Sequence, residues 1–99
     1  MCGAPDQAVA LPAGTDLTTA TVLAGRVLAD GAPVGGAFVR LLDGTGEFTA
    51  EVVSSASGDF RFFAAPGTWT VRALSRSGNG ESVINAEAPG LHQTQIAVA

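Results

Sequence analysis

Hydrophobic and polar residues alternate along most of the chain after Thr21, in short runs separated by turn-forming residues. In Glu47–Val53, for example, every second residue is apolar. A period of two is typical of a β-strand with one face against a core. No window of helical length keeps an apolar period of 3.6, so we expect no helix. The alternation predicts seven strands, over Thr21–Leu28, Ala37–Leu42, Glu47–Val53, Asp59–Ala64, Trp69–Ser75, Glu81–Ala86 and His92–Val98.

Turn-forming residues fill the segments between the predicted strands. The stretch Ala29–Gly36 reads ADGAPVGG, and Asp43–Gly46 reads DGTG between two alternating runs. A further turn is predicted at Arg76–Gly80. Short strands that recur about every 8 to 12 residues between such turns are typical of a sandwich or barrel. The pattern therefore predicts an all-β fold, a seven-stranded antiparallel Greek-key β-sandwich over residues 21–99, preceded by a flexible N-terminal arm over residues 1–20.

Alternation also assigns each side chain to one face of its strand. Phe60 and Phe62 share one face of their strand, and Trp69 shares a face with Val71 in the strand that follows. We expect these apolar faces to pack together, with Trp69 in the core rather than at a contact surface. The predicted core comprises Val22 or Leu23, Val27, Val39, Leu41, Phe48, Val52, Phe60, Phe62, Val71, Ile84 and Ile96.

The composition agrees with a single compact domain. The chain has 99 residues, of which 46% are hydrophobic and 14% are charged. This balance excludes a disordered chain, which would be poor in hydrophobic residues and rich in charge. No apolar stretch approaches the roughly 18 residues of a transmembrane helix. The N-terminal residues carry no basic region followed by an apolar run, so we expect neither a secretory nor a lipoprotein signal and a cytoplasmic location.

The charge balance argues against two classes of partner. The net charge is −4, and five arginines supply all of the positive charge because the chain has no lysine. No run of basic residues is present that could neutralise a phosphate backbone. No basic amphipathic segment points to a membrane surface. We therefore expect no nucleic-acid partner and no membrane partner.

Residues with catalytic or metal-binding chemistry are few. Cys2 is the only cysteine and His92 the only histidine, so we expect no disulfide and no metal cluster. His92 alternates with Ile96, which predicts a satisfied histidine at the rim of the core. Cys2 lies in the predicted arm, where its thiol is either inert or reactive. The sequence thus predicts no catalytic residue, no metal and no cofactor, and leaves Cys2 as the candidate reactive thiol.

Several motifs resemble known sandwich domains. They are Gly25-Arg-Val, Gly36-Ala-Phe-Val-Arg-Leu, Gly58-Asp-Phe-Arg-Phe and Pro66-Gly-Thr-Trp-Thr-Val. Together they resemble the prealbumin-type, transthyretin-like sandwich of carboxypeptidase regulatory-like domains. Enzymes of this fold use tyrosines or several histidines, and its cross-linked relatives use lysines. This chain has no tyrosine, one histidine and no lysine, so the comparison predicts a domain without enzymatic activity.

A second resemblance covers Thr21 to about Gly80. The runs Val39-Arg-Leu-Leu-Asp43 and Glu47-Phe-Thr-Ala-Glu-Val52, behind an N-terminal Met-Cys, are similar to a family of small actinobacterial proteins called SseC-type. That family is uncharacterised and is associated with thiosulfate sulfurtransferases. The resemblance implies an accessory role in sulfur metabolism, with Cys2 as a sulfur carrier for such an enzyme.

One face of the predicted central hairpin mixes charged and apolar side chains. Phe38, Arg40 and Glu51 share this face. Arg61 and Phe63 have the corresponding parity on the strand after the hairpin. Such residues form either a solvated surface with ion pairs or a recognition surface. The second interpretation predicts a non-enzymatic protein-interaction module with a protein partner, which includes a homo-oligomer, and the sulfur carrier described above is the alternative function.

Overall fold

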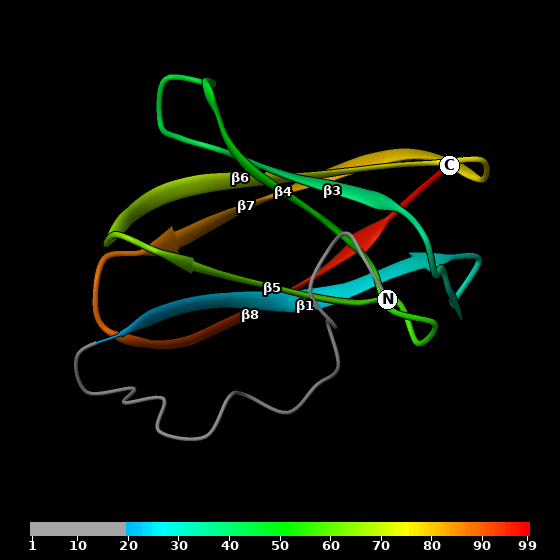
Figure 1. The fold of residues 1–99 in the computed structure, drawn as a ribbon, viewed down its shortest axis with the longest axis horizontal. Coiled ribbons are helices and arrows are strands. Elements are labelled where there is room, and N and C mark those ends of the chain that lie inside the picture. Colours follow the sequence, from blue (N-terminus) through cyan, green and yellow to red (C-terminus); the bar gives the residue numbers. More distant parts are fainter. Residues whose placement is uncertain (1–19) are drawn as a thin grey trace.

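The fold is a β-sandwich of two layers (Figure 1). The computed structural model describes residues 20–99. In this part of the chain all regular elements are strands, so no helix is present that could cross a membrane. The strands are β1 (Thr21–Ala29), β2 (Ala32–Pro33), β3 (Phe38–Leu42), β4 (Phe48–Val53), β5 (Asp59–Ala64), β6 (Gly67–Ser75), β7 (Gly78–Ala86) and β8 (Gly90–Ala97).

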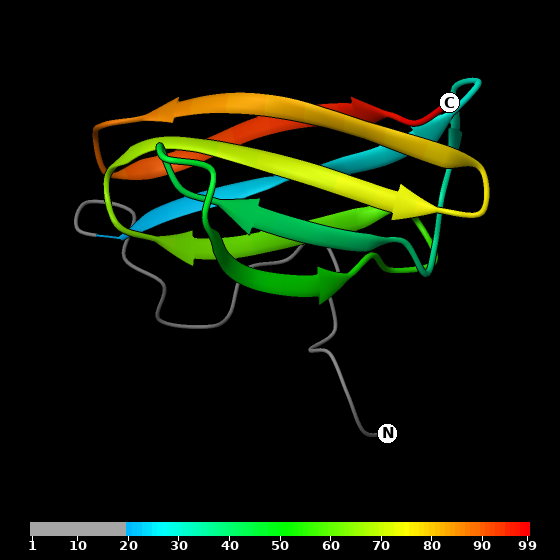
Figure 2. The same cartoon turned by 90° about the horizontal axis from the view of Figure 1, so that it is seen from above.

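The strands divide into two sheets, which Figures 1 and 2 show from two directions. In the first sheet β1 is central, with β5 and β8 as its long neighbours and the two-residue β2 paired to its end. The second sheet has the order β4-β3-β6-β7. The apolar faces of both sheets contribute to one core. The predicted all-β sandwich is thus confirmed.

One strand pairing departs from the predicted antiparallel arrangement. β1 and β8 run parallel, with Thr21 opposite Gly90 and Leu28 opposite Ala97. The other pairs within residues 20–99 are antiparallel. Alternation reveals the period of a strand but not the direction of its neighbour, so it could not distinguish the two kinds of pairing.

Asp30 and Gly31 form the loop between β1 and β2. Both residues have positive φ, 51° and 80°, as a two-residue type I′ hairpin turn requires. The sequence predicts only a turn over Ala29–Gly36, and the structure places the short strand β2 inside that stretch.

Gly78 and Gly80 belong to β7, although the sequence predicts a turn over Arg76–Gly80. The pairing of β6 with β7 continues to Ser75 opposite Gly78, so the turn contains only the residues between these two. β7 here passes close to the C-terminal residues. A Cβ built on Gly80 would lie 2.1 Å from the carbonyl oxygen of Ala97. Glycine at position 80 therefore allows the backbone of β7 to approach that of the C-terminal strand closely. The turn predicted from the sequence is too long because it includes residues that belong to β7.

The core contains most of the predicted side chains. Val22 is buried, and Val52 and Trp69 pack against the core cluster. The indole Nε1 of Trp69 donates a hydrogen bond of 2.8 Å to the carbonyl oxygen of Ala65, which satisfies its polar atom at the core edge. Nine further predicted residues lie in the buried cluster: Leu23, Val27, Val39, Leu41, Phe60, Phe62, Val71, Ile84 and Ile96.

Phe48 does not belong to the core, so this part of the prediction is wrong. Its side chain is 61% exposed. Leu41 lies opposite Ala50 in the register of β3 and β4, whereas the next residue, Leu42, lies opposite Phe48. Thr49 is left as an extra residue, which makes a β-bulge. A bulge changes the face of the residues beyond it, and Phe48 accordingly lies on the outer face beside Leu42.

The carboxylate of Asp43 holds the loop between β3 and β4. Its Oδ1 accepts hydrogen bonds from Thr45 Oγ1 at 2.6 Å, from Thr45 N at 2.8 Å and from Glu47 N at 3.0 Å. These bonds, that from the Thr45 hydroxyl above all, lower the pKa of Asp43 from its ordinary value of 3.8 because they favour the charged form. The loop fixes the hairpin that carries Arg40 and Glu51.

Candidate functional site

The structure divides the five predicted interaction residues between the two layers. Phe38 and Arg40 on β3 and Glu51 on β4 lie on the outer face of the second sheet. Arg61 and Phe63 lie on β5, which belongs to the first sheet. The chain crosses from one sheet to the other between β4 and β5. The five residues therefore form two surfaces on opposite layers and not one face.

Four charged side chains form a row across the second sheet, which we call the charged row. On β4 and β3, Glu51 lies opposite Arg40, with Arg40 Nε 2.8 Å from Glu51 Oε2. On β6 and β7, Arg72 lies opposite Glu81, with Arg72 Nη2 3.1 Å from Glu81 Oε1. The two arginines are themselves cross-strand neighbours. The charges across the sheet therefore read negative, positive, positive, negative.

Exposed apolar side chains flank the charged row on both sides. Phe38 lies two residues before Arg40 on β3 and is 51% exposed. Phe48 and Val83 lie on the other side of the row, and each is 61% exposed. Exposed aromatic side chains that surround paired charges are typical of a protein-protein interface. Phe38, Phe48, Val83 and the charged row together are called the mixed face below.

Four members of the mixed face are absent from the candidates that the sequence predicts: Phe48, which is expected in the core, and Arg72, Glu81 and Val83. Glu81 and Val83 alternate with the buried Ile84, and Arg72 alternates with the buried Val71. This parity shows that the three side chains point outward. Their alignment with Arg40 depends on the register between strands, which alternation within one strand does not contain.

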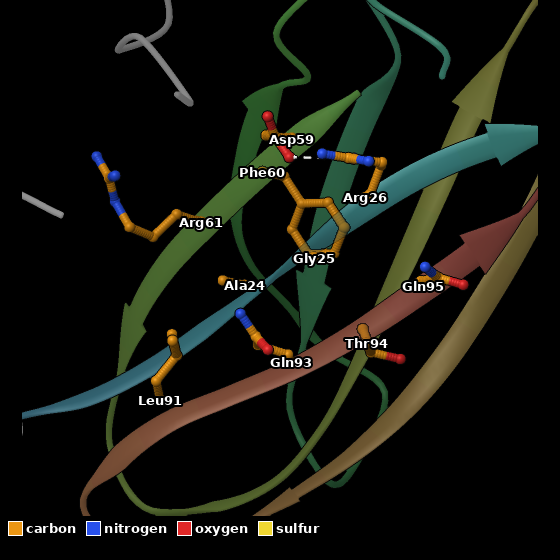
Figure 3. A pocket seen from close by; sticks show the side chains of 10 residues that line it. All are labelled: Ala24, Gly25, Arg26, Asp59, Phe60, Arg61, Leu91, Gln93, Thr94 and Gln95. Carbon is orange, nitrogen blue, oxygen red and sulfur yellow. Dashed lines mark hydrogen bonds and ion pairs between the residues drawn. The ribbon is translucent and has the colours of Figure 1, made fainter. Parts of the chain in front are cut away.

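A groove lies on the outer face of the first sheet, on the opposite layer from the mixed face. Figure 3 shows its lining side chains on β1, β5 and β8. The volume is about 650 Å³. The register places Arg61 and Gln93 on either side of the short side chain of Ala24. Arg26 Nε lies 3.4 Å from Asp59 Oδ1. Of these residues, the sequence singled out only Arg61.

The remaining candidates from the sequence add no catalytic arrangement. Within residues 20–99, no group of three His, Cys, Asp or Glu side chains is placed so that it could hold a metal ion. His92 Nε2 donates a hydrogen bond of 2.8 Å to the Ala88 carbonyl oxygen, which agrees with the predicted satisfied histidine. Cys2, the candidate reactive thiol, lies outside the residues that the structure describes.

Comparison with known proteins identifies relatives along the whole chain. A family model described as "Protein of unknown function (DUF1416)" matches residues 2–98. The uncharacterised proteins Rv0814c and Rv3118 of Mycobacterium tuberculosis are each 58% identical over 99 residues, which is 99% of this chain and 99% of theirs. An uncharacterised protein of Mycolicibacterium smegmatis is 62% identical over 90 residues, which cover 90% of this chain and 100% of that protein.

A solved structure supports the fold. A DUF3823 family protein from Parabacteroides merdae superposes with a TM-score of 0.63 at 14% sequence identity. The match covers 81% of this chain and 46% of that one, so this chain spans less than half of that protein. The names of these relatives mention no sulfur chemistry, and the association with sulfurtransferases stays a prediction. The extent of the family match and the identity to the mycobacterial proteins place this chain in the DUF1416 family.

Proposed function

We propose that this domain is a non-enzymatic protein-interaction module, and that its mixed face associates with a second copy of the chain. The observation that carries the proposal is the order of side chains on that face. A charged row with the signs −, +, +, − lies between apolar side chains on both sides. When the two copies are offset by one strand, one arginine of this pattern faces a glutamate of the second copy and the reverse, so a two-fold symmetric interface can use the pattern.

Symmetry explains how the rows would meet. A two-fold axis parallel to the strands keeps each row opposite the same row of the second copy, so apolar side chains face apolar side chains. If this axis runs along β6, its neighbours β3 and β7 exchange places in the facing sheet. Arg40 then faces Glu81 of the second copy, and Glu81 faces Arg40 of the second copy. Arg72 on the axis faces Arg72 of the second copy, and each arginine keeps the glutamate of its own chain, so the covered face has no net charge.

The apolar side chains supply the driving force. Phe38, Phe48 and Val83 are more than half exposed in one chain. Burial of apolar surface contributes about 25 cal/mol per Å², and aromatic side chains bury about 150–250 Å² each. Both copies bring the same three residues, so each contribution is made twice in a symmetric dimer.

Light scattering coupled to size-exclusion chromatography on the full chain tests this function. We expect a dimer for the wild type. In the Phe38→Glu variant, a new negative charge in the apolar row should weaken the dimer by roughly tenfold or more. Phe63→Glu is the matched control, because Phe63 is similarly exposed but lies on the opposite layer. A wild-type chain that stays monomeric at all concentrations, or a Phe38→Glu variant that dimerises like the wild type, would contradict the proposal.

The alternative function, a sulfur carrier for a thiosulfate sulfurtransferase, depends on Cys2. The family match begins at residue 2, so this segment is part of what the family shares. In a carrier step, the Cys2 thiolate would attack the outer sulfur of the enzyme's persulfide, and the enzyme's thiolate would leave. Intact mass of the chain after incubation with such an enzyme and thiosulfate should then show a gain of one sulfur atom. Cys2→Ser is the control, and a wild type without the adduct under turnover would rule out the carrier role.

A further inference from the structure

We infer that the groove on the first sheet is a binding site for a small amphipathic carboxylate, a ligand with an apolar body and one carboxylate group. The groove lies on the layer opposite the mixed face, so this inference does not depend on the proposed dimer. Its volume of about 650 Å³ falls within the range of about 300–1,000 Å³ that is usual for small-molecule sites.

The shape of the groove follows from small residues on its floor. Ala24 and Gly25 occupy the middle of the central strand β1. The cross-strand partners of Ala24 are Arg61 on β5 and Gln93 on β8, and Figure 3 shows Gln93 beside Ala24 and Arg61 directed away from it. A ligand that lies along β1 between β5 and β8 would contact backbone and a methyl group below it.

Beneath the floor, the ring of Phe60 closes the groove toward the core. Phe60 is the cross-strand partner of Gly25, and a Cβ on this glycine would lie 2.8 Å from Phe60 Cζ. The missing side chain therefore lets the Phe60 ring lie directly against the backbone of β1 on the core side of the floor. Phe60 also makes the floor apolar.

One end of the groove provides donors for a carboxylate. Arg26 is half exposed, and its Nε lies 3.4 Å from a largely buried Asp59 oxygen. A guanidinium has five N–H donors, so this contact orients Arg26 and leaves donors for a ligand. Gln95 lies opposite Arg26 on β8 and adds an amide. Arg61 already makes an interaction of its own, and it is not counted among these donors.

An arginine and amide donors lie together at this end. Arg26 is paired with Asp59, and Gln95 beside it carries a side-chain amide. Arginine with neighbouring amide donors is a typical binding arrangement for carboxylates.

At the other end of the groove, the lining residue Leu91 on β8 is apolar and exposed. The exposed Phe63 on β5 lies in the same row, across the buried Val22 of β1, and adjoins that end. This row is four residues from Arg26 along β1, a distance of about 13 Å in an extended strand. The separation of an apolar row from a guanidinium row selects a ligand with an apolar chain on one side and its charge on the other.

Decanoate is a suitable probe because it has this chemistry, and acetate and decanol are its matched controls. Acetate has the carboxylate without the chain, and decanol has the chain without the charge. We expect decanoate to bind the full-length protein and to shift the backbone amide NMR signals of β1, β5 and β8. Acetate and decanol should bind at least about tenfold more weakly. Equal binding of decanol, or shifts confined to other strands, would overturn the inference.

Two variants locate the carboxylate. Gln93→Glu changes an exposed amide to a carboxylate of the same size, so it should fold normally and weaken decanoate roughly tenfold by repulsion. Arg26→Gln removes the main donor and should weaken decanoate at least as much, with thermal unfolding as the check on its fold. Arg40→Gln on the opposite layer is the control and should bind like the wild type. Unchanged affinity in the folded Gln93→Glu variant would exclude a carboxylate at this site.

Discussion

Replacement of Phe60 with alanine is expected to lower the free energy of unfolding by about 3–5 kcal/mol. Phe60 has the largest fully buried side chain among the described residues, with 1% of its surface exposed. Its ring covers Gly25 of the neighbouring strand and lies 6.1 Å from the ring of Phe62, centroid to centroid. The truncation removes this packing and leaves a cavity between the sheets. A small domain has a total stability of about 5–15 kcal/mol, so most of the margin would be lost.

Phe63 provides the matched control on the same strand. It lies three residues after Phe60, on the outer face, and is 54% exposed. We expect Phe63→Ala to change the stability by less than about 1 kcal/mol. Urea unfolding followed by tryptophan fluorescence measures both variants, because Trp69 packs against the same core. Similar losses for Phe60→Ala and Phe63→Ala would show that the assignment of the two faces of β5 is incorrect.

The Gly80→Ala variant is expected to lose about 2–3 kcal/mol, near the upper end for the insertion of one methyl group into a packed site. The added Cβ would lie 2.1 Å from the carbonyl oxygen of Ala97 and 3.1 Å from a methyl carbon of Ile96. The nearest atom belongs to the backbone of β8, so a side-chain rotation cannot relieve the contact. β7 and β8 belong to different sheets, and the substitution should therefore push the two layers apart at this edge.

Gly44 gives the control for the Gly80 substitution. It lies in the loop between β3 and β4, where an added Cβ meets nothing closer than 3.7 Å. Gly44→Ala should leave the stability within about 0.5 kcal/mol of the wild type. Chemical denaturation of both variants makes the comparison. If Gly80→Ala were as stable as Gly44→Ala, β7 would not approach the C-terminal strand as closely as the structure shows.

The two proposed surfaces can be tested independently because they lie on opposite layers. A Phe38→Glu variant should lose the dimer and still bind decanoate. A Gln93→Glu variant should lose decanoate binding and still form the dimer. A single variant that abolished both properties would point to a loss of fold, which thermal unfolding would reveal.

The candidate surfaces could be predicted only in part. The parity of Phe38, Arg40 and Glu51 identified three outward side chains of one hairpin correctly. Parity also placed Arg61 and Phe63 outward, but it does not state which sheet a strand joins. The groove was not predicted, because its walls come from β5 and β8 while its floor comes from β1. These strands are distant in the sequence and meet only through the register of the folded sheet.

The sequence by itself determined the local features of this protein. The period of two predicted the strands, because a residue on a half-buried strand is apolar only when it points to the core. It also placed Phe60, Phe62 and Val71 in the interior. The Asp-Gly and Gly-rich stretches marked most of the turns, since they relieve the steric restriction on positive φ.

Tertiary structure alone decided how the strands combine. It set the parallel pairing of β1 with β8, the bulge that exposes Phe48, and the close approach at Gly80 that resembled a turn in the sequence. It also aligned Glu51, Arg40, Arg72 and Glu81 into one row. The physical reason is the same in each case. These features depend on which backbone lies beside which, and that is settled by the packing of two whole sheets around a common core.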